Sequence, residues 1–223
     1  VQSSYKTVVE MLVAVLLLIY PTAMLILKGG MNGAFILMLV FALLILAARP
    51  SDMRAVVWRR EWTPYALAMF AMTIAIFVSQ SWFQNYDAHP YDAASRYWLA
   101  IPVFLLLQRL GLKVFVPLQY AFPIAAISGL LMAQNIGDGR SGISTLDLIH
   151  FGDFELTLGV LSVLSIDWFG KDKLALRLLK MAGLVAGVLA SIASGSRGGW
   201  LAIPVFIAII AYFRWGRMSG KTL

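Results

Sequence analysis

Apolar stretches long enough to cross a bilayer recur along almost the whole chain, and they limit its possible folds more than any other feature. A transmembrane helix needs about 20 mostly apolar residues. Eight such stretches can be separated by charged and polar boundaries, at residues 7–27, 31–48, 63–83, 96–110, 114–135, 152–169, 178–194 and 199–215. We therefore expect an all-α fold: a polytopic transmembrane helical bundle of about eight spans, forming a single domain over residues 1–223.

The composition agrees with a membrane protein. The chain is 61% apolar and 13% charged, whereas a soluble domain is about half apolar and about a quarter charged. These values argue against a soluble enzyme, a disordered protein and a coiled coil. The chain contains no cysteine, which excludes disulfides, zinc–thiolate sites and iron–sulfur clusters. It starts at Val1 and ends after a basic tail, and we expect it to be part of a longer protein.

The basic residues orient the predicted spans. With a cytoplasmic N-terminus, the outer side keeps four of the 18 basic residues, namely Lys28, Arg96, Arg140 and Arg197. The inner side receives the other 14: Lys6, Arg49, Arg54, Arg59, Arg60, Arg109, Lys113, Lys171, Lys173, Arg177, Lys180, Arg214, Arg217 and Lys221. Basic loops are retained in the cytoplasm, so both ends are expected there. The net charge of +7 then indicates contact with membrane lipids rather than with nucleic acid.

Two arginines lie deeper than the ends of a span. Arg96 and Arg109 are 13 residues apart, about 20 Å along a helix, whereas the hydrocarbon core is about 30 Å thick. If Arg109 marks the inner edge, Arg96 falls short of the outer edge. Arg197 is 17 residues from both Lys180 and Arg214, about 25 Å, which puts it at the tip of a helical hairpin. Ionisable residues at such depth are functional candidates.

The turn around Arg197 has the composition of an anion site. Residues 194–199 read S-G-S-R-G-G, and glycines permit tight turns and close approach of a ligand. Free N–H groups at the start of the next helix, with the guanidinium of Arg197, suit a phosphate or pyrophosphate. Ser196 and Gly198 flank Arg197 and belong to the same candidate site. The alternative is that Arg197 only anchors the hairpin to lipid phosphates.

The outer segments carry both histidines and six of the eleven acids: Asp87, Asp92, Asp138, Asp147, Asp153 and Glu155. Asp147, His150 and Asp153 are spaced by three residues, so a helix would stack them on one face and make His150 a weak candidate for a general base. A solvated loop gives the same spacing. Two distant histidines do not form a metal site, and none is expected.

Three outward charges, Asp92, Arg96 and Arg140, are also candidates for substrate binding. Asp92 and Arg96 are at i, i+4, where they either pair with each other or shape an outward-facing cavity. Arg140 lies in the next outer segment. No phosphate-binding loop of the Walker type is present.

Three segments together resemble one family, the bacterial O-antigen ligases and the related O-antigen polymerases. S-G-S-R-G-G-W-L-A at residues 194–202 is similar to the family's S-x-S-R-G-x-W-L motif, and D-A-A-S-R-Y at residues 92–97 resembles its D-x-x-S-R-Y motif. H-F-G-D at residues 150–153 resembles a short Phe-Gly stretch of the same family. The order and spacing of the three segments agree along most of the chain.

This resemblance implies a metal-independent glycosyltransferase of the bacterial inner membrane, with its active site on the periplasmic face. It would transfer a glycan from undecaprenyl pyrophosphate to the lipid A core, in lipopolysaccharide biosynthesis, without a nucleotide sugar or other cofactor. Arg197 matches a family arginine that holds the pyrophosphate, and Arg96 is a second candidate. The family's essential His lies in a large periplasmic domain after the S-R-G hairpin, so we expect it beyond Leu223 and assign no catalytic base here.

Other functions remain open at this point. An O-antigen polymerase shares the hairpin but uses a growing glycan as the acceptor. A transporter or flippase for a polyprenyl-linked glycan also needs outward-facing arginines, but it typically shows broken helices in two related halves. A structural membrane subunit would use the arginines as anchors.

Overall fold

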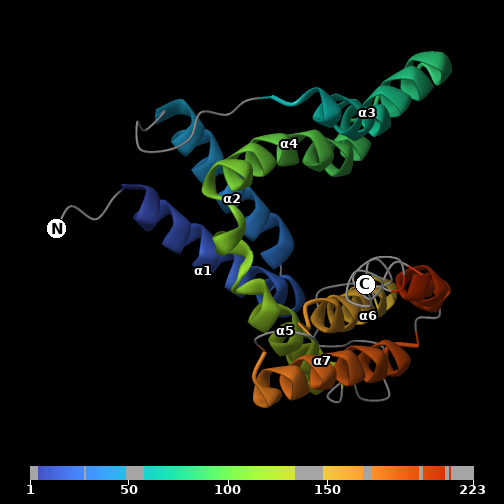
Figure 1. The fold of residues 1–223 in the computed structure, drawn as a ribbon. Coiled ribbons are helices and arrows are strands. Elements are labelled where there is room, and N and C mark those ends of the chain that lie inside the picture. Colours follow the sequence, from blue (N-terminus) through green and yellow to red (C-terminus); the bar gives the residue numbers. More distant parts are fainter. Residues whose placement is uncertain are drawn as a thin grey trace, which may run out of the picture. The chain divides into compact units, whose positions relative to one another are not determined.

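The computed structural model describes residues 5–27, 29–48, 58–133, 148–167, 172–195, 198–208 and 211, and all regular structure within them is helical (Figure 1). The α-helices are α1 (Tyr5–Ile26), α2 (Gly30–Ala48), α3 (Thr63–Phe83), α4 (His89–Leu110), α5 (Leu118–Ala133), α6 (Leu148–Leu164) and α7 (Leu174–Ala193). Three short 3-10 helices, η1 (Arg60–Trp62), η2 (Leu112–Phe115) and η3 (Gly198–Ala202), lie next to them. The all-α prediction is confirmed over this part of the chain.

Five helical segments of the described residues are long and apolar enough to cross a membrane: Lys6–Ile26, Gly30–Ala48, Arg60–Phe83, Leu112–Ala133 and Leu174–Ala193. They coincide with five of the eight predicted spans. Helix α4 carries charged residues in its first half, α6 has 17 residues, and the last predicted span extends past the described residues. Five apolar helices are compatible with a membrane protein, and the count of eight spans stays a prediction.

Helix α4 begins seven residues earlier than the predicted span 96–110. Gln84 ends α3 with a left-handed backbone (φ 50°), and its N–H donates to the Gln80 carbonyl. The Asp87 carboxylate then accepts a hydrogen bond of 2.9 Å from the N–H of His89, and Pro90 stands in the first turn of α4. Proline and a nearby acceptor both favour a helix start. The boundary was predicted too late because polar residues of this first turn were assigned to a loop.

The chain divides into two compact units, each described by itself. The first unit holds Val1–Val13 and Phe35–Val114. In it α3 and α4 pack as an antiparallel hairpin: the rings of Trp62 and Phe104 meet edge to face at 5.1 Å, and those of Phe70 and Trp98 stack at 5.9 Å. Such aromatic pairs add stability beyond the area that they bury.

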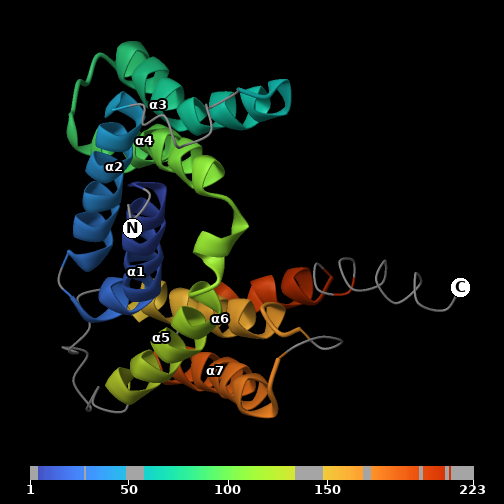
Figure 2. The ribbon, with the colours of Figure 1, turned by 60° about the vertical axis from the view of Figure 1, so that its left-hand side comes forward.

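The second unit holds Ala14–Ala34 and Phe115–Leu223, and α5, α6 and α7 pack together in it (Figure 2). Small residues let these helices approach closely. A Cβ added to Gly159 would lie 3.3 Å from Gly187 Cα, and one added to Gly183 would lie 2.7 Å from Pro123 Cα. Close backbone approach through small residues is typical of helix packing in membranes. Phe151, Ala126 and Ala190 fill the core between these helices.

The connection between α6 and α7 is held by a buried lysine. Lys180 Nζ donates to Asp172 Oδ2 and to the Ser165 carbonyl, both at 2.7 Å, and the Lys180 side chain has no exposed surface. Burial alone would raise the pKa of the Asp172 carboxyl, but hydrogen bonds from Lys180 and the Asp167 N–H outweigh this effect and lower it. Helix α6 ends at Leu164, before the end of the predicted span 152–169, and the Ser165 carbonyl just after it accepts from Lys180.

Candidate functional site

The start of α6 lies against the segment that follows α7. A Cβ added to Gly199 would lie 2.8 Å from Asp153 Oδ1 and 3.3 Å from Leu156 Cδ2. Asp153 belongs to the H-F-G-D segment and Gly199 to the S-G-S-R-G-G turn. Two segments whose contacting residues, 153 and 199, are 46 positions apart in the sequence therefore meet within the second unit. The absence of a side chain at residue 199 makes room for the carboxylate.

Helix α7 ends in the turn that was predicted to form an anion site. Gly195 has a positive φ of 71°, and its N–H donates to the Ile192 carbonyl at 3.0 Å. Ser194 Oγ donates to the Ser191 carbonyl at 2.8 Å. A left-handed residue is readily supplied by glycine, so the structural role predicted for the glycines is confirmed at Gly195. The described chain resumes with η3 at Gly198, and Ser196 and Arg197 lie outside the described residues.

Asp92 and Arg96 form the predicted i, i+4 pair in α4. Arg96 Nη2 lies 2.5 Å from Asp92 Oδ2, and the two side chains are 33% and 73% exposed. Ser95 Oγ also donates to the Asp92 carbonyl at 2.9 Å. The pairing is thus confirmed, and about a third of the guanidinium-bearing side chain stays accessible. These residues belong to the first unit, whereas Gly198 belongs to the second.

The remaining candidates are divided between described and undescribed residues. His150 is exposed in the first turn of α6, and Asp153, three residues later, is half-buried. Asp147 and Arg140 lie outside the described residues. Within the described ranges, no three His, Asp or Glu side chains are arranged to hold a metal ion.

Glu155, counted from the sequence among the acids of the outer segments, is buried between helices of the second unit. The residue has no exposed surface, and its carboxyl group lies directly over Gly129 of α5. Neither carboxyl oxygen makes a hydrogen bond within the described part of the chain. Helix α6 starts at Leu148, so Glu155 is two turns inside it and faces another helix. The signal in the sequence was its position between Phe154 and Leu156, in an otherwise apolar run.

The chain is similar to part of a longer bacterial protein. It is 30% identical over 126 residues to a protein of Haemophilus influenzae described only as uncharacterized, and the match covers 54% of this chain and 31% of that relative. The chain thus matches less than a third of the length of that relative. No known protein family matches the sequence, and no solved structure matches it. The activity, substrates and partners of this chain are therefore proposals.

Proposed function

We propose that the protein is an O-antigen ligase of the bacterial inner membrane, with both ends of this chain in the cytoplasm. It transfers a glycan from undecaprenyl pyrophosphate to the lipid A core on the periplasmic face. The bond between the anomeric carbon and the pyrophosphate oxygen breaks, and a glycosidic bond forms to an acceptor hydroxyl. Undecaprenyl pyrophosphate leaves, and the proton of the acceptor hydroxyl passes to a base.

The contact between Asp153 and Gly199 carries this proposal. Two of the three segments that resemble the ligase family, H-F-G-D and S-G-S-R-G-G, meet there, although a whole helix separates them in the sequence. Two separate stretches that resemble one family support a common binding site more strongly when they are neighbours in space. A binding site needs several groups at one place. The left-handed Gly195 supports the same turn.

In the proposed site Arg197 and the neighbouring backbone N–H groups bind the donor. Arg197 binds the donor pyrophosphate in a bidentate manner, and the N–H groups beside it, at Ser196 and Gly198, add donors to the same anion. Arg96, paired with Asp92 in α4, and Arg140 stay separate candidates for substrate binding. His150 is a weak candidate for the base, since the resemblance places the essential His beyond Leu223.

Glycan transfer by the purified full-length protein tests the proposal. The reaction contains undecaprenyl-pyrophosphate-linked glycan and rough lipopolysaccharide that carries the lipid A core. A ligase converts the rough acceptor to a glycan-bearing product, whereas a polymerase lengthens the lipid-linked glycan. Movement of labelled donor between the leaflets of a vesicle, without any glycan transfer, would indicate a flippase. If the protein neither transfers the glycan nor moves the donor, it is a structural subunit. Each of the last three outcomes overturns the ligase.

A further inference from the structure

We propose that the hairpin of α3 and α4 holds an anionic phospholipid, with its acyl chain in an aromatic cavity and its phosphate against Arg59 and Arg60. The proposal is independent of glycan transfer. It concerns the first unit, at the end of the hairpin where α3 begins.

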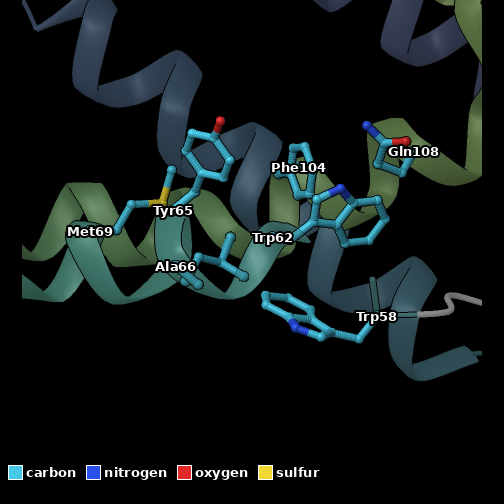
Figure 3. Close-up of a pocket in the computed structure, with 8 residues that line it drawn as sticks. Trp58, Trp62, Tyr65, Ala66, Met69, Phe104 and Gln108 are labelled. Atoms are coloured by element: carbon cyan, nitrogen blue, oxygen red, sulfur yellow. The ribbon is translucent and has the colours of Figure 1, made fainter. Parts of the chain in front are cut away.

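The cavity is shaped for a hydrocarbon chain. Its volume is about 350 Å³, within the usual range for small-molecule sites. Trp58 and Trp62 line it from the segment before α3, Tyr65 and Met69 from α3, and Ile101 and Phe104 from α4. Figure 3 shows the rings of Trp62 and Phe104 next to each other in this cavity. The lining is mostly apolar, and Gln108 is the residue with an amide group among those that line it. An apolar chain therefore fits this cavity better than a sugar or a nucleotide.

Two indole rings in the wall of the cavity are held in place by their contacts. Trp58 Nε1 donates to Thr63 Oγ1 at 3.0 Å, and the rings of Trp58 and Trp62 meet edge to face at 5.8 Å. Tryptophan is enriched where hydrocarbon meets the polar headgroups. The cavity therefore lies at the level where a lipid changes from acyl chain to headgroup.

Two arginines, Arg59 and Arg60, lie next in sequence to the lining residues Trp58 and Trp62. The Arg59 guanidinium lies 5.7 Å from the centre of the Trp62 ring, and both Arg59 and Arg60 are exposed. Glu61 is the acid beside them, so these three residues carry one net positive charge. In the sequence, residues 49–60 hold four arginines and one acid. A cluster of this kind next to a span attracts anionic headgroups, and this charge selects an anionic lipid over a zwitterionic one.

Brominated lipids test the site, because bromine on an acyl chain quenches nearby tryptophans. The purified protein is placed in phosphatidylcholine nanodiscs that contain a small fraction of brominated phosphatidylglycerol or, in parallel, of brominated phosphatidylcholine. We expect brominated phosphatidylglycerol to quench tryptophan fluorescence more than brominated phosphatidylcholine does. This extra quenching should disappear when Trp58 and Trp62 are both replaced by phenylalanine. Equal quenching by the two lipids would overturn the proposal.

Charge and shape variants separate the two parts of the site. Arg59→Gln with Arg60→Gln should lower the preference for phosphatidylglycerol about tenfold, since each basic residue contributes to anionic-lipid binding. The same positions changed to lysine should keep it, and Lys113→Gln, an exposed basic residue of the same unit, is the matched control. Ala66→Phe should fill the cavity and remove the excess quenching, whereas Ala68→Phe on an exposed face of α3 should not.

Two results would contradict the site. One is a preference that persists in the double glutamine variant. The other is cross-linking of a Trp58→Cys variant to a second copy of the chain without any lipid preference, which would make the cavity a protein–protein interface.

Discussion

The carboxyl group of Glu155 lies over the α carbon of Gly129, in the place that a Cβ atom at residue 129 would take. The two helices can meet at this point only because residue 129 has no side chain. The buried carboxyl and the glycine are thus one packing feature, shared by α5 and α6.

Replacement of Gly129 by alanine should therefore destabilise the protein by about 1–3 kcal/mol, as overpacking of a filled core does. The variant Glu155→Ala should offset this loss in the double variant, because the added methyl group then has room. Thermal unfolding of both single variants and the double variant in the same detergent measures the coupling. Strictly additive effects would show that the two side-chain positions do not compete.

Gly187 in α7 is a second close contact. A Cβ there would lie 2.4 Å from the Glu155 carbonyl oxygen and 3.0 Å from Gly159 Cα. Since both partners are backbone atoms of α6, Gly187→Ala should cost about 1–3 kcal/mol of unfolding free energy. Gly33 in α2 is the matched control, because a Cβ there meets nothing within 4 Å. Gly33→Ala should be neutral or stabilising by up to about 1 kcal/mol, and equal losses at both positions would refute the packing.

The pair of Asp172 and Lys180 makes stability depend on pH. The pKa of Asp172 is lower in the folded protein than its ordinary value, so the pair stabilises the fold above the unfolded-state pKa, about 3.9. This stabilisation is lost as the pH falls through the folded-state pKa. Asp172→Asn should lower the free energy of unfolding by about 3 kcal/mol at neutral pH, the lower end of the loss for a broken buried pair. The loss stays at that end because Ser165 and Gln119 still accept hydrogen bonds from Lys180.

Unfolding of wild type and Asp172→Asn between pH 7 and pH 3 checks this. The difference in the free energy of unfolding between the two proteins should become smaller towards pH 3. Lys6→Met breaks the partly exposed pair with Glu10 and should change the free energy of unfolding by less than about 1 kcal/mol. A difference that grows on acidification would contradict the assignment.

Membrane topology is predicted by the basic residues alone. Reporter fusions after Arg60 and after Lys173 should report the cytoplasm, and a fusion between α3 and α4, at Tyr86, should report the periplasm. Periplasmic signals at Arg60 or Lys173 would reverse the orientation.

The lengths of apolar runs were enough to predict α1, α2, α3 and α7 to within a few residues. In lipid a mostly apolar segment satisfies its backbone hydrogen bonds as a helix or in a closed barrel. The start of α4 was missed because its polar first turn resembles an outer loop, although the Asp87 carboxylate and Pro90 favour a helix start there. The buried Glu155 was missed because its burial depends on a glycine 26 residues earlier in another helix. The contact of Asp153 with Gly199 likewise depends on how α6 and α7 pack, and no local pattern encodes it.

Donor binding and glycan transfer by variants of Arg197 test the proposed ligase site most directly. A charge-assisted contact to phosphate contributes about 1.5–3 kcal/mol, so Arg197→Ala should weaken binding of the lipid-linked donor about tenfold to a hundredfold and abolish most transfer. Arg197→Lys should recover little, because an ammonium cannot reproduce the planar fork of the guanidinium. Lys6→Ala, which removes a basic residue on the other predicted side, should keep full activity. If the lysine variant transfers glycan at the wild-type rate with unchanged donor affinity, Arg197 is an anchor and does not bind the pyrophosphate.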